Sequence, residues 1–178
     1  MTGLRTATGA DVPAVVALVQ QAYRGEASRA GWTTEADLLD GQRTDAAAVT
    51  ALLGAPGSVV LLLEDDGRLL ACCHVEARPA ADGGTTGYVG MVAVDPARQG
   101  AGTGRALLAA AQAHARDALG ATRLEMTVIA QRAELISWYE RRGWRRTGER
   151  RPFPYGDERF GRPRRDDLEF VVLAHADG

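Results

Sequence analysis

Hydrophobic side chains in the first third of the chain recur at helical spacing. The apolar positions of residues 12–23 follow one face of a helix, and the Thr-Gly-Ala-Asp sequence at 8–11 has the spacing of a capping box ahead of it. Residues 46–54, "AAAVTALLG", predict a second helix that begins after Thr44 or Asp45. Turn formers and acidic residues dominate the segment between the two helices, so we expect a long irregular connection there.

The middle of the chain has the apolar runs of a sheet. Residues 59–63 and 69–75 are apolar and are separated by the turn sequence "EDDGR", which predicts a β-hairpin. Residues 88–94, "YVGMVAV", predict a further strand after a glycine-containing loop. Three consecutive antiparallel strands are therefore expected.

The second half of the chain alternates between the two patterns. After a glycine-rich turn, apolar positions mark one face of a helix that ends at Gly120. Residues 122–129 alternate as a strand does, and residues 133–142 return to helical spacing. Residues 143–150 and 168–175 predict two last strands on either side of a long loop.

Composition indicates a folded protein and excludes several chemistries. With 178 residues and 46% apolar side chains the chain can bury a core, and no repeat or linker divides it, so we expect residues 1–178 to form one domain. All 21 basic residues are arginine, which excludes a phosphate-loop lysine and a catalytic lysine. The net charge of −2 gives no overall attraction to nucleic acid or to an anionic membrane.

The cysteines and the first helix bear on the compartment. Cys72 and Cys73 are adjacent in a predicted strand, so their side chains point to opposite faces and do not bond to each other. We expect no disulfide, and hence a reducing compartment. The apolar stretch at 12–19 is short and lacks a basic leader, which favours a helix over a targeting segment. We therefore expect a cytoplasmic protein without membrane association, and we assign no metal ligand.

The most unusual stretch is "RQGAGTGRALL", residues 98–108, in which Gly100, Gly102 and Gly104 occupy alternate positions ahead of a helical pattern. A helix N-terminus presents unpaired N–H groups and the positive end of its dipole, and glycines let an anion approach that backbone. We expect a pyrophosphate site; the simpler alternative is a purely structural turn. Neither the dinucleotide fingerprint nor the phosphate-binding loop of NTPases fits, because Arg105 stands where the first needs glycine and the second needs lysine.

The longer segment "VAVDPARQGAGTGRALL", residues 92–108, resembles the acetyl-CoA-binding motif of the GNAT (Gcn5-related N-acetyltransferase) superfamily. That motif consists of an apolar strand, a proline-containing turn, Arg or Gln, alternating glycines and a helix. The positions that fill it here are Gln99, Gly100, Gly102 and Gly104. The segment "LISWYERRGW", residues 135–144, resembles a later segment of the same family, and the resemblance as a whole covers residues 88–144.

The resemblance implies a fold and a cofactor. The fold is α/β, with a mixed, mostly antiparallel sheet flanked by helices, in which two parallel strands splay apart around the pantetheine arm of acetyl-CoA. By this resemblance, residues 88–94 and 122–129 are those strands. The backbone groups expected to meet the thioester arm belong to Val92, Ala93 and Val94. The residues expected to hold the pyrophosphate are Gln99, Gly100, Ala101, Gly102, Thr103, Gly104 and Arg105. The side chains of Arg98 and Arg105 either reach a phosphate or lie on the surface.

The family's catalytic tyrosine corresponds to Tyr139. Aminolysis of a thioester needs a neutral amine, a polarised carbonyl and a proton for the leaving thiolate, and a phenol of pKa near ~10 is a suitable donor. The alternative is that Tyr139 only packs beside Trp138. Polarisation of the carbonyl is expected from a backbone N–H near Val92 or Ala93.

No general base is assigned, because residues 87–94 contain no acid where some family members have a glutamate. The candidates elsewhere are His74, Glu76, Glu125, Glu35 and Asp40, and proton loss through ordered water needs none of them. A second departure from the family is Arg132, which stands where many members have a cofactor-binding asparagine. It is expected to contact phosphate or acceptor, or to cap a loop.

Two variable segments are expected to select the acceptor. Residues 31–45 supply acidic side chains that would attract an amine, whereas Arg43 among them would hold a carboxylate. Residues 141–165 contain ten arginines interleaved with aromatic residues, which is compatible with RNA or an acidic peptide. At a net charge of −2 a solvated loop is the more typical explanation.

The sequence thus predicts an acetyl-CoA-dependent N-acetyltransferase that acts on a primary amine of a small molecule, with neither membrane nor nucleic acid as a partner. A homodimer is compatible with it. The alternatives are a non-catalytic acyl-CoA-binding or sensing domain, and an RNA- or peptide-associated module built on the arginine-rich segment.

Overall fold

The computed structural model describes the backbone of residues 2–176 and the side chains of residues 2–175. The helices are α1 (Val12–Tyr23), α2 (Gly25–Ser28), α3 (Ala46–Gly54), α4 (Thr103–Asp117) and α5 (Ala133–Glu140). The strands are β1 (Thr2–Thr6), β2 (Leu39–Asp40), β3 (Ser58–Asp65), β4 (Arg68–Pro79), β5 (Thr85–Val94), β6 (Arg123–Ile129), β7 (Arg145–Pro152), β8 (Arg162–Pro163) and β9 (Glu169–Ala176). Three short 3-10 turns are η1 (Gly9–Asp11), η2 (Pro96–Arg98) and η3 (Glu158–Phe160).

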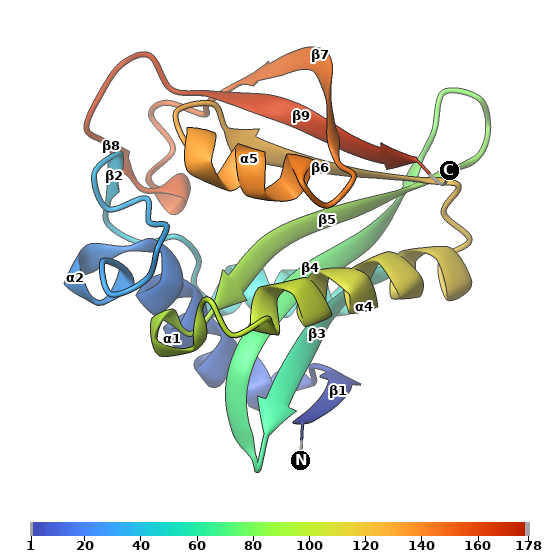
Figure 1. Ribbon diagram of the computed structural model, residues 1–178, viewed down its shortest axis with the longest axis horizontal. Helices are drawn as coiled ribbons and strands as arrows, with labels where there is room; N and C mark the ends of the chain where they lie inside the picture. Colours follow the sequence, from blue (N-terminus) through green and yellow to red (C-terminus); the bar gives the residue numbers. More distant parts are fainter. Residues whose placement is uncertain (1, 177–178) are drawn as a thin grey trace.

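Seven of the strands form one sheet in the order β1-β3-β4-β5-β6-β9-β7, and β2 pairs with β8 in a separate small sheet. Neighbouring strands of the large sheet are antiparallel except β5 and β6, which are parallel. Helices cover both faces of this sheet (Figure 1). The predicted α/β fold with a mixed, mostly antiparallel sheet is confirmed, and so are the three consecutive antiparallel strands β3, β4 and β5.

The two faces of the sheet carry separate hydrophobic cores. Leu107 of α4 and Ile136 of α5 are fully buried in one core, and Val19 of α1 is fully buried in the other. Cys73 belongs to the first core and Cys72 to the second, and both are free thiols. The predicted opposite orientation of the two cysteines is therefore confirmed.

The parallel pair β5 and β6 separates along its length. Register pairs join only residues 86–88 of β5 to residues 123–125 of β6. Beyond Tyr88, β5 also carries a bulge against β4, and there Met91 adopts a φ of +50°. Side chains with a Cβ adopt this left-handed conformation rarely, and such bulges commonly redirect a strand next to a functional site. The predicted separation of β5 from β6 is therefore present, and the bulge at Met91 lies just past Tyr88, the last residue of β5 that pairs with β6.

Capping and turn signals form where the sequence predicts them. The backbone N–H of Thr8 donates to the Asp11 carboxylate over 2.7 Å. At the start of α3 the N–H of Ala48 donates to the Asp45 carboxylate, also over 2.7 Å. Residues 66–67 of the β3–β4 hairpin have φ values of +46° and +77°, which two-residue hairpin turns require.

Four short elements lie outside the predicted pattern. Strand β1 consists of five exposed residues, so no apolar alternation marks it, and it is a strand because it pairs along the edge of β3. The elements α2, β2 and β8 fall in segments predicted to be irregular. Within residues 2–176, no helix has the length and apolar character needed to cross a membrane.

Candidate active site

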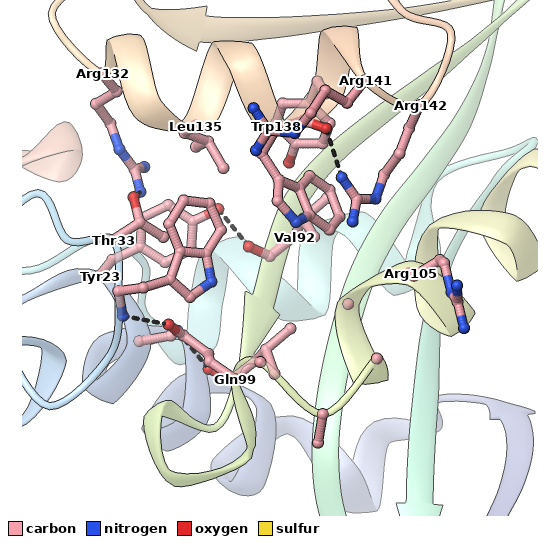
Figure 2. Close-up of a pocket in the computed structure, with 18 residues that line it drawn as sticks. Tyr23, Thr33, Val92, Gln99, Arg105, Arg132, Leu135, Trp138, Arg141 and Arg142 are labelled. Atoms are coloured by element: carbon pink, nitrogen blue, oxygen red, sulfur yellow. Dashed lines mark hydrogen bonds between the residues drawn. The ribbon is translucent and has the colours of Figure 1, made fainter.

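A cavity of about 650 Å³ lies beside the end of β5, beyond the residues that pair with β6 (Figure 2). Its walls come from the end of β5, the turn into α4, helix α5, the end of α1 and the loop that follows α2. The sequence-predicted site residues that line it are Val92, Val94, Gln99, Gly100, Ala101, Gly102, Gly104, Arg105 and Tyr139. Two others do not line it: Thr103, and Ala93, which pairs with Cys72 of β4 and is buried in the core beneath α1.

The glycine turn has the backbone conformation that its sequence suggests. Gly100 and Gly102 have φ values of +84° and +86°, in the left-handed region that favours glycine. Gly102 is the N-cap of α4, and its carbonyl accepts the N–H of Ala106 over 3.0 Å. The N–H groups of residues 103–105 precede the first hydrogen bond of the helix, and their end of the helix meets the cavity. The glycines therefore satisfy a structural need and leave the helix N-terminus accessible to an anion.

The charged side chains around this cavity have one sign. Among the residues that the structure describes, four arginines and no acidic side chain line it: Arg105, Arg132, Arg141 and Arg142. Arg142 lies 3.6 Å from the centre of the Trp138 ring and donates to the Trp138 carbonyl over 2.7 Å. Burial, together with like charges nearby, lowers the pKa of Arg142. This concentration of cations next to a helix N-terminus suits a ligand with several negative charges.

The loop after α2 reaches across the cavity to the glycine turn. The backbone N–H of Trp32 donates to Gln99 Oε1 over 2.9 Å, and Gln99 Nε2 donates to the Val94 carbonyl over 3.4 Å. The Trp32 ring lies 6.2 Å from that of Trp138 on α5. Figure 2 shows Gln99 and Trp138 on opposite sides of the cavity. The sequence predicts this loop to select the acceptor, and it also borders the larger cavity.

Tyr139 on α5 is 4% exposed and packs edge-on against Trp138 and Trp144. Among the described residues its hydroxyl has no hydrogen-bond partner. Burial raises the pKa of this phenol above its ordinary value, so it stays protonated at neutral pH. These properties are those of a side chain that can give up a proton only when a strong base forms beside it.

A second phenol, which the sequence reasoning missed, lies at the same place. The hydroxyl of Tyr23, the last residue of α1, donates to the carbonyl of Val92 over 2.7 Å. Burial raises the pKa of Tyr23 to about 12. The helical spacing of Tyr23 predicted only that it packs on the buried face of α1. No local signal in the sequence shows that the last turn of this helix borders the cavity.

A smaller cavity of about 220 Å³ adjoins the first one. The two share Tyr23, Val92, Arg132, Leu135 and Tyr139 in their walls. The smaller one also contains aromatic rings from the sheet and the C-terminal segment: Tyr88, Phe153, Phe160 and Phe170. Both tyrosines, and Val92 of the strand bulge, border both cavities. Two groups that react with each other, one from each cavity, would therefore meet beside these residues.

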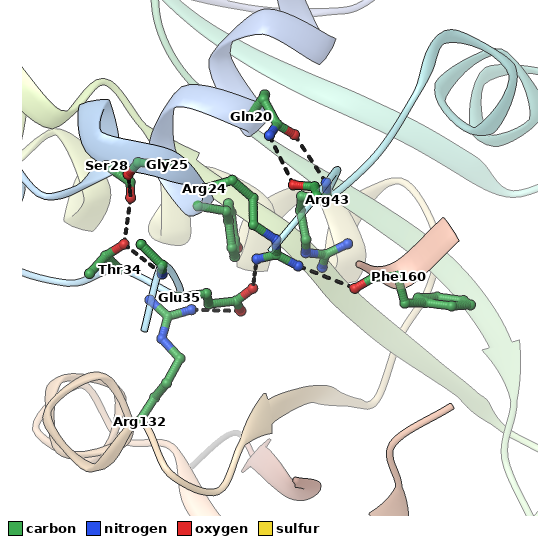
Figure 3. Close-up of polar contacts among 12 residues, drawn as sticks. Gln20, Arg24, Gly25, Ser28, Thr34, Glu35, Arg43, Arg132 and Phe160 are labelled. Atoms are coloured by element: carbon green, nitrogen blue, oxygen red, sulfur yellow. Dashed lines mark hydrogen bonds and ion pairs between the residues drawn. The ribbon is translucent and has the colours of Figure 1, made fainter. Parts of the chain in front are cut away.

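One buried carboxylate organises the polar end of the smaller cavity (Figure 3). Glu35 Oε2 pairs with Arg24, and Glu35 Oε1 accepts from Arg132 Nη1 over 3.0 Å. Arg132 also donates to Thr33 Oγ1 over 2.7 Å, and Arg24 donates to the carbonyl of Phe160 over 3.3 Å. Burial by itself raises the pKa of the Glu35 carboxyl, but the surrounding arginine charges outweigh it and the pKa lies below its ordinary value. Glu35 is thus an ionised partner of the arginines and a weak base.

The other candidate bases lie away from both cavities. Ser58 donates its single hydroxyl proton to the Leu52 carbonyl over 2.7 Å, so His74 Nε2, 2.8 Å from Ser58 Oγ, must be the donor in that contact. Burial lowers the pKa of His74, and the residue ties β4 to Ser58 at the start of β3, which in turn bonds α3. Glu76, Glu125 and Asp40 pair with Arg78, Arg151 and Arg164, respectively.

Fold and site together define a class of protein: an α/β protein in which two parallel strands split apart beside a helix N-terminus. The profile of the acetyltransferase (GNAT) family matches residues 17–144. The chain therefore belongs to this family, and the predicted family and enzyme class are confirmed. A comparison with curated proteins gives no match.

Solved structures of similar fold include acetyltransferases with different acceptors. The chain is 23% identical to yncA from Salmonella typhimurium, solved with its cofactor acetyl-CoA, over 98% of this chain and 93% of that one, with a TM-score of 0.67. It is 21% identical to the ribosomal-protein-alanine N-acetyltransferase from Brucella melitensis, over 98% and 99%, with a TM-score of 0.71. It is also 21% identical to nourseothricin acetyltransferase, over 98% of both chains, with a TM-score of 0.67. These similarities show the fold.

Proposed function

We propose that this protein is an acetyl-CoA-dependent N-acetyltransferase that acts on the primary amine of a small molecule. The observation that carries the proposal is the pair of adjoining cavities with Tyr139 in the wall of both. One cavity has a volume of about 650 Å³ and the positive charge for a cofactor with several phosphates, and the other is small and lies beside the bulge of β5. A thioester in the first and an amine in the second would meet at the shared wall.

The glycine turn and the end of β5 are assigned to the cofactor. The N-terminus of α4, with the segment Gln99–Arg105, is proposed to hold the pyrophosphate, and Arg141 and Arg142 add charge on the facing wall. The carbonyls of Val92 and Val94 are bonded by Tyr23 and Gln99, both of which line this cavity. Each carbonyl keeps a second lone pair and neither contact uses the N–H groups, so the backbone of Val92 and Val94 is proposed to meet the pantetheine arm, whereas Ala93 contributes packing beneath α1.

Tyr139 is proposed as the proton donor. When bound, acetyl-CoA supplies an activated acyl group; the amine nitrogen forms a bond to the acyl carbon while the carbon–sulfur bond breaks. The Tyr139 hydroxyl then gives its proton to the departing sulfur, the proton lost by the amine passes to water, and Tyr139 regains a proton from that water. Val92, in the strand bulge, is the proposed source of the backbone N–H that polarises the acyl oxygen.

The residues around the amine favour its neutral form without a dedicated base. Glu35 is held by two arginines and is a poor proton acceptor. Positive charge near an ammonium group lowers its pKa, so the arginines themselves favour the neutral nucleophile.

The arginine-rich segment gives little support to an RNA-associated module. Six of its ten arginines form ion pairs with carboxylates: Arg146, Arg150, Arg151, Arg159, Arg164 and Arg165. Charges already paired in this way attract phosphate weakly.

Calorimetry with acetyl-CoA and a CoA-release assay over a panel of primary amines test the proposal. We expect saturable binding of acetyl-CoA in the range of roughly 1 μM to 1 mM that is typical of enzyme substrates, and amine-dependent release of CoA. Binding without CoA release from any amine would favour the sensing domain. The absence of any heat with millimolar acetyl-CoA would exclude both.

A further inference from the structure

The smaller cavity has more positive charge than its own residues neutralise. Its charged lining consists of three arginines and one glutamate: Arg24, Arg43, Arg132 and Glu35. Each oxygen of the Glu35 carboxylate already has an arginine partner, Oε1 from Arg132 and Oε2 from Arg24. One of the three arginines therefore has no carboxylate partner among the residues that line the cavity.

The uncommitted cation is Arg43. Its backbone N–H donates to Gln20 Oε1 over 3.0 Å, and Gln20 Nε2 donates to the carbonyl of Gly41 over 3.1 Å, so α1 fixes this part of the loop (Figure 3). Its guanidinium lies 5.0 Å from the centre of the Tyr23 ring. Among the described residues the Arg43 side chain forms no ion pair. Its backbone is thus held while its five N–H donors remain available to a ligand.

The two paired arginines have donors to spare as well. Arg24 is 3% exposed and Arg132 is 5% exposed, and the Nε atom of each is buried without a hydrogen-bond partner. Both Nε–H groups are closed off from solvent, so they add positive potential to this part of the cavity rather than a direct contact with a ligand. An oxyanion supplies the negative charge that the lining lacks, and its lone pairs match the free N–H donors of Arg43.

Another part of the lining is aromatic. Phe153 and Phe170 contribute their rings to it, and the two rings lie 5.7 Å apart. No acidic side chain other than Glu35 lines the cavity, so nothing in its described walls holds an extra ammonium group. At about 220 Å³ the space suits a small molecule with an apolar body.

We propose that the acceptor is an amino acid with an apolar or aromatic side chain, whose carboxylate is bound by Arg43 and whose amine faces Tyr139. This inference rests on the proposed acetyltransferase function and adds the substrate class to it. Arg43 recognises the carboxylate, the buried Nε donors add to the positive field around it, and Phe153 and Phe170 receive the side chain.

The test uses amino acids and their decarboxylated counterparts, which differ only in the carboxylate. The pairs are L-phenylalanine with phenethylamine, L-tryptophan with tryptamine, and L-leucine with 3-methylbutylamine. We expect kcat/KM for at least one amino acid to exceed that of its counterpart by about 10-fold or more, as a charge-assisted contact predicts. If no amino acid is acetylated, or if the decarboxylated amines react as well, the inference is wrong.

Arg43→Gln separates recognition from catalysis. It should raise KM for the preferred amino acid roughly 10- to 100-fold and leave kcat within about threefold, and the preference over the decarboxylated amine should disappear. Arg150→Gln is the control, because Arg150 is exposed on β7, pairs with Glu169 and lines neither cavity; its KM should match the wild type. Equal KM values for wild type and Arg43→Gln would overturn the inference.

Calorimetry with acetyl-CoA shows whether a negative result contradicts the proposed acetyltransferase function or only the proposed substrate class. Arg43→Gln and wild type should bind acetyl-CoA equally, because Arg43 does not line the larger cavity. If acetyl-CoA binds and carboxylate-free amines are acetylated without preference, only the substrate class is wrong. Faster turnover of phosphoethanolamine than of every amino acid would also overturn it, because it would assign the cationic end to a phosphate.

Discussion

Two phenols border the junction of the cavities, and their hydrogen bonds separate their roles. The Tyr23 hydroxyl donates to the carbonyl of Val92, which steadies the strand bulge. The Tyr139 hydroxyl has no partner among the described residues and stays protonated because burial raises its pKa. Of the two, only Tyr139 can give its proton away without breaking an existing contact.

Tyr139→Phe keeps the ring and removes the proton. We expect kcat to fall by about 100-fold or more, in the usual range for loss of a general acid, while the Kd for acetyl-CoA changes little. Single-turnover CoA release and calorimetry measure the two effects separately. Tyr155→Phe is the control, since the Tyr155 hydroxyl bonds Arg165 and Leu168 outside both cavities and its loss should leave kcat unchanged. A Tyr139→Phe enzyme as fast as wild type would restrict Tyr139 to packing.

At the scale of elements, α4 begins and ends with a left-handed glycine. Gly102 at its N-cap has a φ of +86°, and Gly120 just past its C-terminus has a φ of +66°. A Cβ at Gly102 would come no closer than 4.0 Å to a neighbour, and one at Gly120 would meet nothing within that distance. The two positions therefore share a backbone requirement, and only Gly102 faces the larger cavity.

Gly102→Ala and Gly120→Ala form a matched pair. Each should lower the free energy of unfolding by about 1–2 kcal/mol, the cost of a left-handed residue with a Cβ. Only Gly102→Ala should also weaken acetyl-CoA binding, because the shift of its backbone moves the N–H groups at the start of α4. Urea unfolding and calorimetry give both numbers. Equal acetyl-CoA affinity in the two variants would place the pyrophosphate elsewhere.

For the molecule as a whole, Glu35 connects three distant parts of the chain. It pairs with Arg24 after α1 and with Arg132 before α5, and Arg24 in turn bonds the carbonyl of Phe160 in the C-terminal segment. All three charged side chains are buried. Removing one partner of such a cluster leaves the others as uncompensated buried charges.

Glu35→Gln should lower the free energy of unfolding by about 3–5 kcal/mol at pH 7. The pKa of Glu35 is lowered in the folded state, so its stabilisation is present above the unfolded pKa of about 4.3 and is lost as the pH falls below it. The difference between wild type and Glu35→Gln should therefore narrow below about pH 4.3. Urea unfolding from pH 7 to 3 measures it, with Glu26→Gln as an exposed control. A difference that stays constant over this range would contradict the lowered pKa.

The sequence by itself determined the helices and strands whose residues carry a recognisable pattern within a short stretch of the chain. Apolar periodicity, capping pairs and glycines marked the helices α1, α3, α4 and α5 and the strands of the hairpin, because these signals act between residues close in the chain. The alternating glycines and the downstream tyrosine indicated the family. The edge strand β1 escaped, because its five residues are exposed and only its pairing with β3 makes it a strand.

Only the tertiary structure decided what meets at the site. The sequence around Tyr23 indicated only packing. The charges of Arg24, Glu35 and Arg132 pair in space, although Glu35 and Arg132 are 97 residues apart in the chain. Contacts of this kind depend on how far β5 and β6 separate and on which loops fill the gap, and neither is encoded in a short window of sequence. The excess positive charge of the smaller cavity arises for the same reason, since burial and the three-dimensional grouping of charges create it.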